Sequence, residues 1–554
     1  MSNNVEGVMG VLNGSTLKEV ICYAYQALEA NKEIVNSLNV FPVPDGDTGT
    51  NMSLTMRSAV AKLQEVESPS LGEVGKCISE GSLMGARGNS GVILSQLLRG
   101  FGAELKDQEN LDRRVFARAM RGAANTAYKA VMRPTEGTIL TVARKMAEYA
   151  DDHAREDLKG FDFFDQMLEV GDKALAHTPE QLPILKEAGV VDAGGQGLMI
   201  LLHAAREFLS GERKEYIDFK SQTANFDAQV RAQSENNGEI RFGYCTEFLI
   251  HTDGADEKAV AFRESVADMG DSQLVVGAGD VIKTHIHTNH PGRVLEMALE
   301  LGYLEDIKID NMRLQYQKLS KTFDQEPAPV ETKTARKKYS FIAVSAGDGM
   351  SELFREMGVD EIITGGQTMN PSTEDFMNAI GRVNADHIFL LPNNSNIILA
   401  ATQAKELSEE KVYVIPTRTQ PEGFSALFAF DSDATPQANE QGMVDAIAAV
   451  RTGLITYAVR DSVVSGTKIE KGNYIGLERS NIHSTGHDLE KVVLETLEKL
   501  VDDDSALITL FYGEDVAEAD AQALVEKITA RYSDCDVDAH RGGQPIYYYI
   551  LSVE

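Results

Sequence analysis

The chain contains 554 residues, of which 43% are hydrophobic and 25% charged, and its formal net charge is −32 at pH 7. This length exceeds what one hydrophobic core supports, so we expect several domains with the composition of a globular protein. The negative charge excludes nucleic acid as the main partner and disfavours lasting contact with an anionic membrane, because both require a basic surface.

Cysteine usage and the terminal sequence bear on the cellular compartment. The four cysteines, Cys22, Cys77, Cys245 and Cys535, are widely separated and fit no disulfide framework. The first residues contain no basic segment followed by an apolar run, so no secretory signal is expected. No apolar stretch approaches the ~20 residues that span a bilayer. These features predict a cytoplasmic protein without stable membrane insertion.

Residues 1–210 have the apolar periodicity of helices. Thr16 and Glu19 have the spacing of a capping box and precede apolar residues at helical spacing. Similar apolar stripes follow over residues 52–63 and 92–101, and no convincing strand pattern interrupts them. We therefore predict an all-helical N-terminal domain whose helices begin at glycine-rich turns.

A polar stretch from Gly211 to about Asn237 predicts a linker, and residues 238–322 then have a mixed pattern. Strands are predicted over residues 244–251, 273–276 and 281–288, and helices over residues 258–269 and 294–301. This order predicts a small α+β middle domain of the split βαβ kind.

The proline-containing segment 324–338 predicts a second linker. Beyond it, residues 339–554 alternate between strands and helices, with strands predicted over residues 341–345, 361–364, 387–391 and 411–415. Such alternation is typical of a doubly wound α/β domain with a mostly parallel sheet. More strands are predicted in the final ~100 residues, ending at 546–553.

An acidic turn in the helical domain is the first candidate for a functional site. Asp45 and Asp47 stand one glycine apart, and Thr48, Gly49, Thr50 and Asn51 lead into a helix. Carboxylates at this spacing can bind a hard divalent cation, and amides at a helix start can bind phosphate. A capped loop is the alternative, because Asp, Gly and Asn are ordinary turn residues.

Three further turns strengthen the nucleotide interpretation: residues 85–91, 136–139 and 192–197. The first is rich in small residues and precedes an amphipathic helix, where bare amides and the helix dipole suit phosphate oxygens. It lacks the spacing and the lysine of a P-loop. Each turn alone could be a helix connection, but four of them on one domain favour a nucleotide site.

Three motifs, Asp45-Gly-Asp-Thr-Gly-Thr-Asn51, Gly85-Ala-Arg-Gly-Asn-Ser-Gly91 and Asp192-Ala-Gly-Gly195, resemble the nucleotide-binding subunit of dihydroxyacetone kinases, an antiparallel eight-helix barrel. With Asn39-Val-Phe-Pro-Val-Pro44 and the two added domains, the whole chain resembles the ATP-binding subunits of bacterial fatty acid kinases. The resemblance implies phosphorylation of the carboxylate of a fatty acid, which a separate DegV-like lipid-binding protein presents. The product would be an acyl phosphate for phospholipid synthesis, and pairing into a homodimer is a further expectation.

The resemblance also implies roles for individual residues. Asp45 and Asp47 would bind Mg²⁺ bridging the ATP phosphates, near Thr48, Gly49, Thr50 and Asn51. The phosphate cradle would comprise Gly85, Ala86, Arg87, Gly88, Asn89 and Ser90, and Thr138, Asp192 and Gly194 would lie toward the nucleoside. Arg87 is also a candidate for stabilising the transferring phosphoryl group, with a structural ion pair as the alternative.

The metal site departs from the dihydroxyacetone kinase pattern at one position. That pattern has a third aspartate about five residues upstream of the pair, whereas Val40 stands there in this chain, beside Asn39. Either Asn39 is a weaker ligand or an acidic side chain from elsewhere completes the shell. A fatty acid carboxylate is ionised at neutral pH, so the proposed transfer needs no general base.

The middle domain contains a candidate zinc site. His285 and His287 alternate on one predicted strand and Cys245 lies on another, so the three could bind Zn²⁺ if the strands are neighbours. Glu247 could fill the fourth position. The alternative is a pair of ordinary strand histidines and an unligated cysteine. Participation of His285 and His287 in catalysis is left open.

Polar, glycine-rich loops follow the predicted strands of the last domain, at the edge where open α/β sheets bind ligands. These loops are residues 347–349, 365–372, 392–396 and 416–420. The domain resembles the DegV-like fold, and we expect it to dock the lipid-carrying partner. Two other functions compete with the fatty acid kinase: a kinase for a small ketone or sugar, and a non-catalytic nucleotide-sensing scaffold.

Overall fold

The computed structural model describes residues 12–39, 46–131, 134–155, 161–212, 242–278, 281–311, 336–365, 370–458, 461–464, 467–479 and 481–554. They belong to two units, of which one comprises Met1–Lys214 with Ala335–Glu554 and the other Glu215–Thr334. Most of both predicted linkers falls outside the described residues. Within the described ranges, no helix combines the length and the apolar character needed to cross a bilayer.

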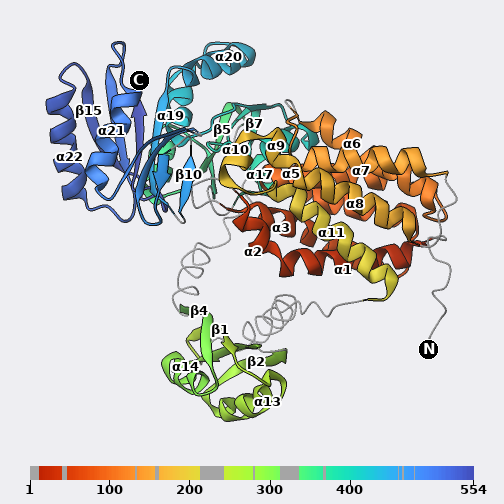
Figure 1. Ribbon diagram of the computed structural model, residues 1–554. Helices are drawn as coiled ribbons and strands as arrows, with labels where there is room; N and C mark the ends of the chain where they lie inside the picture. Colours follow the sequence, from red (N-terminus) through yellow and green to blue (C-terminus); the bar gives the residue numbers. More distant parts are fainter. Residues whose placement is uncertain are drawn as a thin grey trace. The chain divides into compact units, whose positions relative to one another are not determined.

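The first part of the larger unit is helical (Figure 1). Its long helices are α1 (Gly14–Ala30), α3 (Thr48–Gln64), α4 (Leu71–Met84), α5 (Gly88–Ala103), α6 (Arg113–Ala130), α7 (Ile139–His153), α8 (Asp162–Ala176) and α11 (Ala193–Ser210). Shorter helices are α2 (Lys32–Ser37), α9 (Thr178–Gln181) and α10 (Pro183–Ala188). Each long helix contacts the next long helix along the chain, and α11 also contacts α1.

This succession of contacts determines where the helices begin. Neighbouring helices joined by short connections run antiparallel. Every second long helix therefore begins at the same end of the domain, and these helices are α3, α5, α7 and α11. The four glycine-rich turns singled out in the sequence precede these four helices.

The predicted helical faces are buried, whereas one predicted helix start is wrong. Met52, Met56 and Leu63 of α3 are at most 2% exposed. Helix α1 begins at Gly14 rather than at the capping box expected at Thr16, because the Asn13 side chain caps it by accepting from the Thr16 amide at 2.9 Å.

The α/β domain begins with a four-stranded sheet in the order β6-β5-β7-β8, and all three of its strand pairs are parallel. Its elements are β5 (Lys337–Ser345), α16 (Asp348–Glu356), β6 (Glu361–Thr364), α17 (Thr373–Arg382), β7 (Ala385–Leu391), α18 (Ile398–Leu407), β8 (Val412–Val414) and α19 (Gln420–Phe428). The predicted parallel α/β arrangement is confirmed for this sheet.

A second large sheet in the same domain corrects the expectation of one mostly parallel sheet. It has six strands in the order β13-β12-β9-β16-β14-β15, and only β14 and β15 pair in parallel. Its strands are β9 (Arg451–Tyr457), β12 (Tyr474–Glu478), β13 (Asn481–Gly486), β14 (Leu507–Tyr512), β15 (Asp536–Arg541) and β16 (Tyr549–Val553). The remaining elements are α20 (Pro436–Ile447), β10 (Ser462–Val464), β11 (Thr467–Ile469), α21 (Leu489–Leu500) and α22 (Glu518–Arg531). Short hairpin connections make the antiparallel pairs, which a count of alternating elements does not distinguish.

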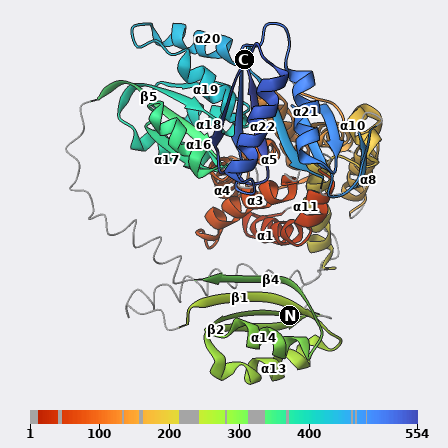
Figure 2. The same ribbon diagram turned by 90° about the vertical axis from the view of Figure 1, so that its left-hand side faces the viewer.

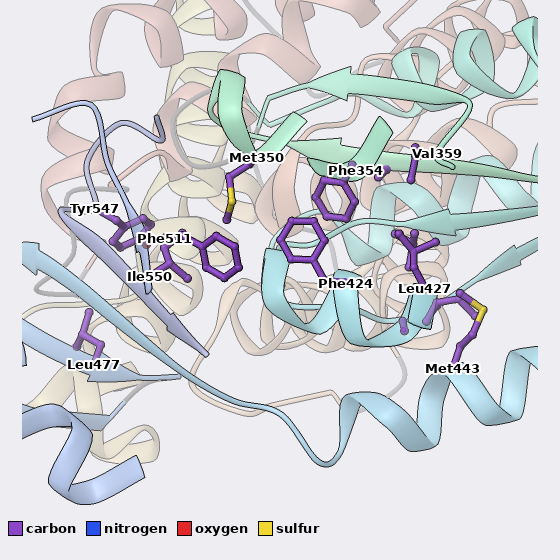
Figure 3. Close-up of a cluster of buried hydrophobic side chains, with 14 of the residues drawn as sticks. Met350, Phe354, Val359, Phe424, Leu427, Met443, Leu477, Phe511, Tyr547 and Ile550 are labelled. Atoms are coloured by element: carbon purple, nitrogen blue, oxygen red, sulfur yellow. The ribbon is translucent and has the colours of Figure 1, made fainter. Parts of the chain in front are cut away.

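A continuous hydrophobic cluster joins the two sheets (Figure 3). Phe354 of α16 and Phe424 of α19 lie with ring centroids 4.2 Å apart, and Phe424 also contacts Phe511 of β14. Tyr547 and Ile550 extend the same cluster along the second sheet. Because both sheets share this core, they form one domain rather than two.

The smaller unit has an antiparallel sheet in the order β2-β3-β1-β4 (Figure 2). Its elements are β1 (Tyr244–His251), α13 (Ala255–Ser265), the short 3₁₀ helix η1 (Ala267–Met269), β2 (Gly270–Ala278), β3 (Val281–Thr288), α14 (Pro291–Leu299) and β4 (Tyr303–Asn311). Strand β3 lies between β1 and β2, which is the split βαβ order. Phe248, Phe262 and Ile286 lie in its core with Val294.

Candidate functional site

The acidic turn leads directly into α3. Asp47 is the residue before the helix, and its carbonyl accepts the Asn51 amide at 2.8 Å. The Thr50 amide donates to Oδ1 of Asn36 at 3.1 Å, and Nδ2 of Asn36 donates to the Thr50 hydroxyl at the same distance. Thr50 thus anchors α3 to α2, a role that the sequence did not indicate. Asp45 lies outside the described residues.

The turn before α5 supplies fewer candidate phosphate ligands than expected. The Gly85 amide donates to the Gly81 carbonyl at 3.1 Å, and the Ala86 amide to the Leu83 carbonyl at 3.5 Å, so both close the end of α4. The first turn of α5 comprises Gly88, Asn89 and Ser90, whose amides the helix's own ladder does not use. The candidate phosphate amides are therefore those of residues 88–90.

Gly88 is required where α5 meets α3. Its φ is +56°, and a Cβ there would lie 2.5 Å from Nδ2 of Asn51 and 3.3 Å from Nδ2 of Asn370. A side chain at this position would be strained by the backbone and would displace both amides. The glycine turn therefore lies against Asn51 of the same domain and against Asn370 of the α/β domain.

Asn370 lies between the two domains and contacts the acidic turn. Its Nδ2 donates to Oδ2 of Asp47 at 2.5 Å and to Oδ1 of Asn51 at 3.4 Å. Asn370 is 2% exposed, and its Oδ1 is buried without a hydrogen-bond partner among the described residues. The sequence placed Asn370 in a polar loop at a sheet edge, but nothing in the sequence connected that loop with Asp47.

Arg87 is also held by the α/β domain. Its Nη1 donates to the Asn370 carbonyl at 2.8 Å and lies 3.4 Å from Oδ2 of Asp375. The Thr373 amide donates to the Ala86 carbonyl at 3.2 Å, next to a β-bridge between Arg87 and Ser372. Oδ1 of Asn396, in the loop after β7, accepts from Nδ2 of Asn89 at 3.5 Å. The guanidinium is thus placed between the domains, beside the candidate phosphate turn.

Asp192 joins the starts of α7 and α11. Its Oδ2 accepts from the Gly195 amide at 2.7 Å, and its carboxyl also accepts from the Ile139 amide. Burial raises the pKa of Asp192 to about 6, against the lowering effect of these two amides. Thr138 precedes α7 and donates its hydroxyl to the Thr135 carbonyl at 2.8 Å, and a Cβ on Gly194 would lie 3.3 Å from Cβ of Ile139.

The raised pKa predicts a pH dependence of stability. The folded protein binds this proton more tightly than the unfolded chain, so the stability is highest below pH ~4 and is lost as the pH rises through about 6. We expect Asp192→Asn, which keeps an acceptor oxygen, to remove this dependence. Above pH 6 it should gain up to about 3 kcal/mol relative to wild type.

Urea denaturation of the two proteins between pH 4 and 7.5 measures this effect as a difference, which cancels the titration of the other carboxylates. Asp192→Ala is the matched variant, because it is equally neutral but leaves the amides of Gly195 and Ile139 without their acceptor. It should be about 1–2 kcal/mol less stable than Asp192→Asn. A wild-type difference that is constant over this pH range would contradict the assignment.

The middle unit brings Cys245 and His287 together. Strands β1 and β3 are neighbours, with Cys245 paired with His287 and Glu247 paired with His285. Cys245 is half-buried and His287 is 8% exposed. Among the side chains that the structure describes, which exclude those of Glu247 and His285, no group of three or more His, Cys, Asp or Glu could hold a metal. The predicted strand pairing is confirmed, and zinc stays a prediction.

Similar solved structures cover separate parts of the chain. A dihydroxyacetone kinase from C. freundii in complex with AMP-PNP and Mg²⁺ matches with 18% identity and a TM-score of 0.29, over 37% of this chain and 36% of that one. A DegV family protein from Corynebacterium glutamicum matches with 12% identity and a TM-score of 0.32, over 39% of this chain and 97% of that one.

Family models and relatives cover nearly the whole chain. Residues 42–207 match the DAK2 domain, residues 241–319 the FakA-like middle domain of fatty acid kinase, and residues 340–554 the FakA-like C-terminal domain of fatty acid kinase. Protein YloV of Bacillus subtilis (strain 168) is 41% identical over 552 residues, which cover 98% of this chain and 99% of that protein. A protein of Staphylococcus aureus (strain MRSA252) is 39% identical over 553 residues, with the same coverage. The chain belongs to the FakA-like family of fatty acid kinase proteins, with a DAK2 domain at its N-terminal end.

Proposed function

We propose that this protein transfers the γ-phosphoryl group of ATP to the carboxylate of a fatty acid held by a separate DegV-like lipid-binding protein. The observation that carries the proposal is the junction of Asp47, Gly88 and Arg87 where α3 and α5 begin, within a chain of this family. The closed succession of helix contacts also supports the eight-helix barrel that the resemblance implies.

Mg²⁺ and ATP fit the residues present. The Asp47 carboxylate and the buried, unpartnered Oδ1 of Asn370 are oxygen donors of the kind that Mg²⁺ prefers. The amides of Gly88, Asn89 and Ser90 suit phosphate oxygens at the start of α5. Bound Mg²⁺ would neutralise phosphate charge, and Asp45 would lie within the same turn. Asp192, Thr138 and Gly194 would shape the nucleoside end.

The chemistry requires positioning rather than a protein nucleophile. A fatty acid is ionised at neutral pH, so a carboxylate oxygen can form the bond to the γ-phosphorus directly. The bond between that phosphorus and the β–γ bridging oxygen breaks, and ADP leaves with the electron pair. Arg87 would offset the negative charge on the transferring group, and the product is an acyl phosphate for phospholipid synthesis.

The α/β domain supports a separate carrier for the lipid. The cavity at the carboxyl edge of its parallel sheet, lined by Ala346, Asn393 and Gln420 among others, has a volume of about 30 Å³. This space holds about one water molecule and cannot admit an acyl chain. We therefore propose that this domain contacts the carrier protein rather than the fatty acid itself.

The test incubates the protein with labelled ATP, Mg²⁺ and a fatty acid, with and without a DegV-like lipid-binding protein from the same organism. We expect acyl phosphate, trapped as the hydroxamate, only when the carrier is present. Phosphorylation of dihydroxyacetone or a sugar instead would favour the small-substrate kinase. Nucleotide binding without any transfer would favour the sensing scaffold.

The register of β1 and β3 supports a zinc site in the middle domain, with Cys245, His285 and His287 as ligands. We expect elemental analysis of the full-length protein to find about one zinc per chain, lost in Cys245→Ser. Wild-type protein without zinc would return His285 and His287 to ordinary strand positions and would remove their candidacy as catalytic residues.

A further inference from the structure

We propose that Asn370 of the α/β domain is part of the metal and nucleotide site of the helical domain. Its side chain would position the Asp47 carboxylate and supply the oxygen that the acidic turn lacks. The inference rests on the proposed function and deepens it, because it makes the nucleotide site a composite of two domains. The residue stands 323 positions from Asp47 in the chain.

The first observation is the contact between the amide and the carboxylate. Nδ2 of Asn370 donates to Oδ2 of Asp47 at 2.5 Å. A carboxylate that binds a metal is commonly oriented by a hydrogen bond from a neighbouring group, and loss of that group typically weakens metal affinity 10- to 100-fold. Asn370 is therefore placed to orient the one carboxylate of the pair that the structure describes.

The second observation is independent of that contact. Oδ1 of Asn370 is buried and has no hydrogen-bond partner in the described part of the chain. Leaving such an acceptor without a partner costs about 1–3 kcal/mol, so its place between Asp47, Asn51 and Gly88 requires a reason. A cation held by Asp47 would provide one, because amide oxygens are good ligands for Mg²⁺ and Asn39 and Val40 offer no third carboxylate.

The third observation is that the neighbouring contacts hold Asn370 in place. Its carbonyl accepts from Arg87, and the Thr373 amide donates to the Ala86 carbonyl. Ala86 and Val92 pack in one hydrophobic cluster with Phe376 and Ile380 of α17. The loop is thus fastened to the turn before α5 on both sides of Asn370, which is how a site residue is held precisely.

The experiment measures binding of AMP-PNP with Mg²⁺ to the full-length protein by calorimetry. We expect Asn370→Ala to raise the dissociation constant at least tenfold and to shift the Mg²⁺ dependence to higher concentration. Asn378→Ala is the matched control, because Asn378 is exposed on α17 of the same domain, and its binding should stay within twofold of wild type. In an Asp47→Asn background, Asn370→Ala should change affinity less than threefold.

A second variant gives a readout that does not depend on affinity or activity. Asn370→Asp places a second carboxylate against Asp47, so its melting temperature without metal should fall below that of wild type. Added Mg²⁺ should then raise the melting temperature more than it does in wild type, because the new carboxylate is a stronger ligand.

The outcomes separate the two proposals. Wild-type protein that does not bind AMP-PNP with Mg²⁺ would overturn the proposed function together with this inference. Normal wild-type binding with unchanged affinity in Asn370→Ala would overturn only the inference. Tighter binding in Asn370→Ala would also overturn it, because the loop would then be obstructing the site.

Discussion

Asp47→Ala is expected to lower acyl phosphate formation by about 1,000-fold or more, because it removes a carboxylate that would hold the metal and the phosphates. The loss should exceed what instability explains, since Asp47 caps no amide of α3 with its side chain. The measurement is the rate of hydroxamate formation with saturating carrier protein, together with the melting temperature of the variant.

The matched control for this prediction is Asp152→Ala, because Asp152 is an exposed residue of α7 in the same domain. It should keep the wild-type rate within about twofold, as surface substitutions generally have small effects. Asp47→Asn provides a second comparison, since it retains the size of the side chain and an acceptor oxygen for Asn370. Wild-type rates in both Asp47 variants would remove Asp47 from the metal site.

Arg87→Ala is expected to lower the turnover number about 100-fold or more, if the guanidinium stabilises the transferring phosphoryl group. The competing structural interpretation is that Arg87 only joins the domains through the Asn370 carbonyl and Asp375. Asp375→Asn distinguishes these interpretations, because it removes the charge of the partner and keeps an acceptor for the capping box of α17.

For phosphoryl stabilisation, Asp375→Asn should retain turnover within about threefold, because the ion pair is partly exposed and such pairs contribute little. Equal losses of turnover in Arg87→Ala and Asp375→Asn would instead identify Arg87 as an interdomain link. Arg382→Ala, which removes an exposed arginine of α17 paired with Glu361, controls for a simple loss of surface charge.

Local patterns predicted much of the secondary structure. The apolar spacing of Met52, Met56 and Leu63 correctly identified the buried face of α3, because side chains three or four apart lie on one side of a helix. The strand over residues 361–364 was predicted with its observed bounds. Local reasoning failed at the start of α1, where two nearby polar residues competed as caps and Asn13 was the one used.

Strand pairing was harder to predict than strand positions. The residues of β9, β12, β14 and β16 form the mostly antiparallel second sheet, although alternating elements suggested parallel pairing. Pairing depends on which edges meet once the helices are packed, and the apolar character of a single strand contains no information about its neighbour.

The candidate site divides in the same way. The amino-acid sequence alone specified the residue types in the glycine-rich turns and the presence of Asp47 before α3, because turn chemistry and helix starts depend on neighbouring residues. The packed structure was needed to show that α3, α5, α7 and α11 begin at one end and that Asn370 meets Asp47 there. A contact across 323 residues arises from the packing of α17 and α18 against α4 and α5, and such packing leaves no periodic signal in the chain.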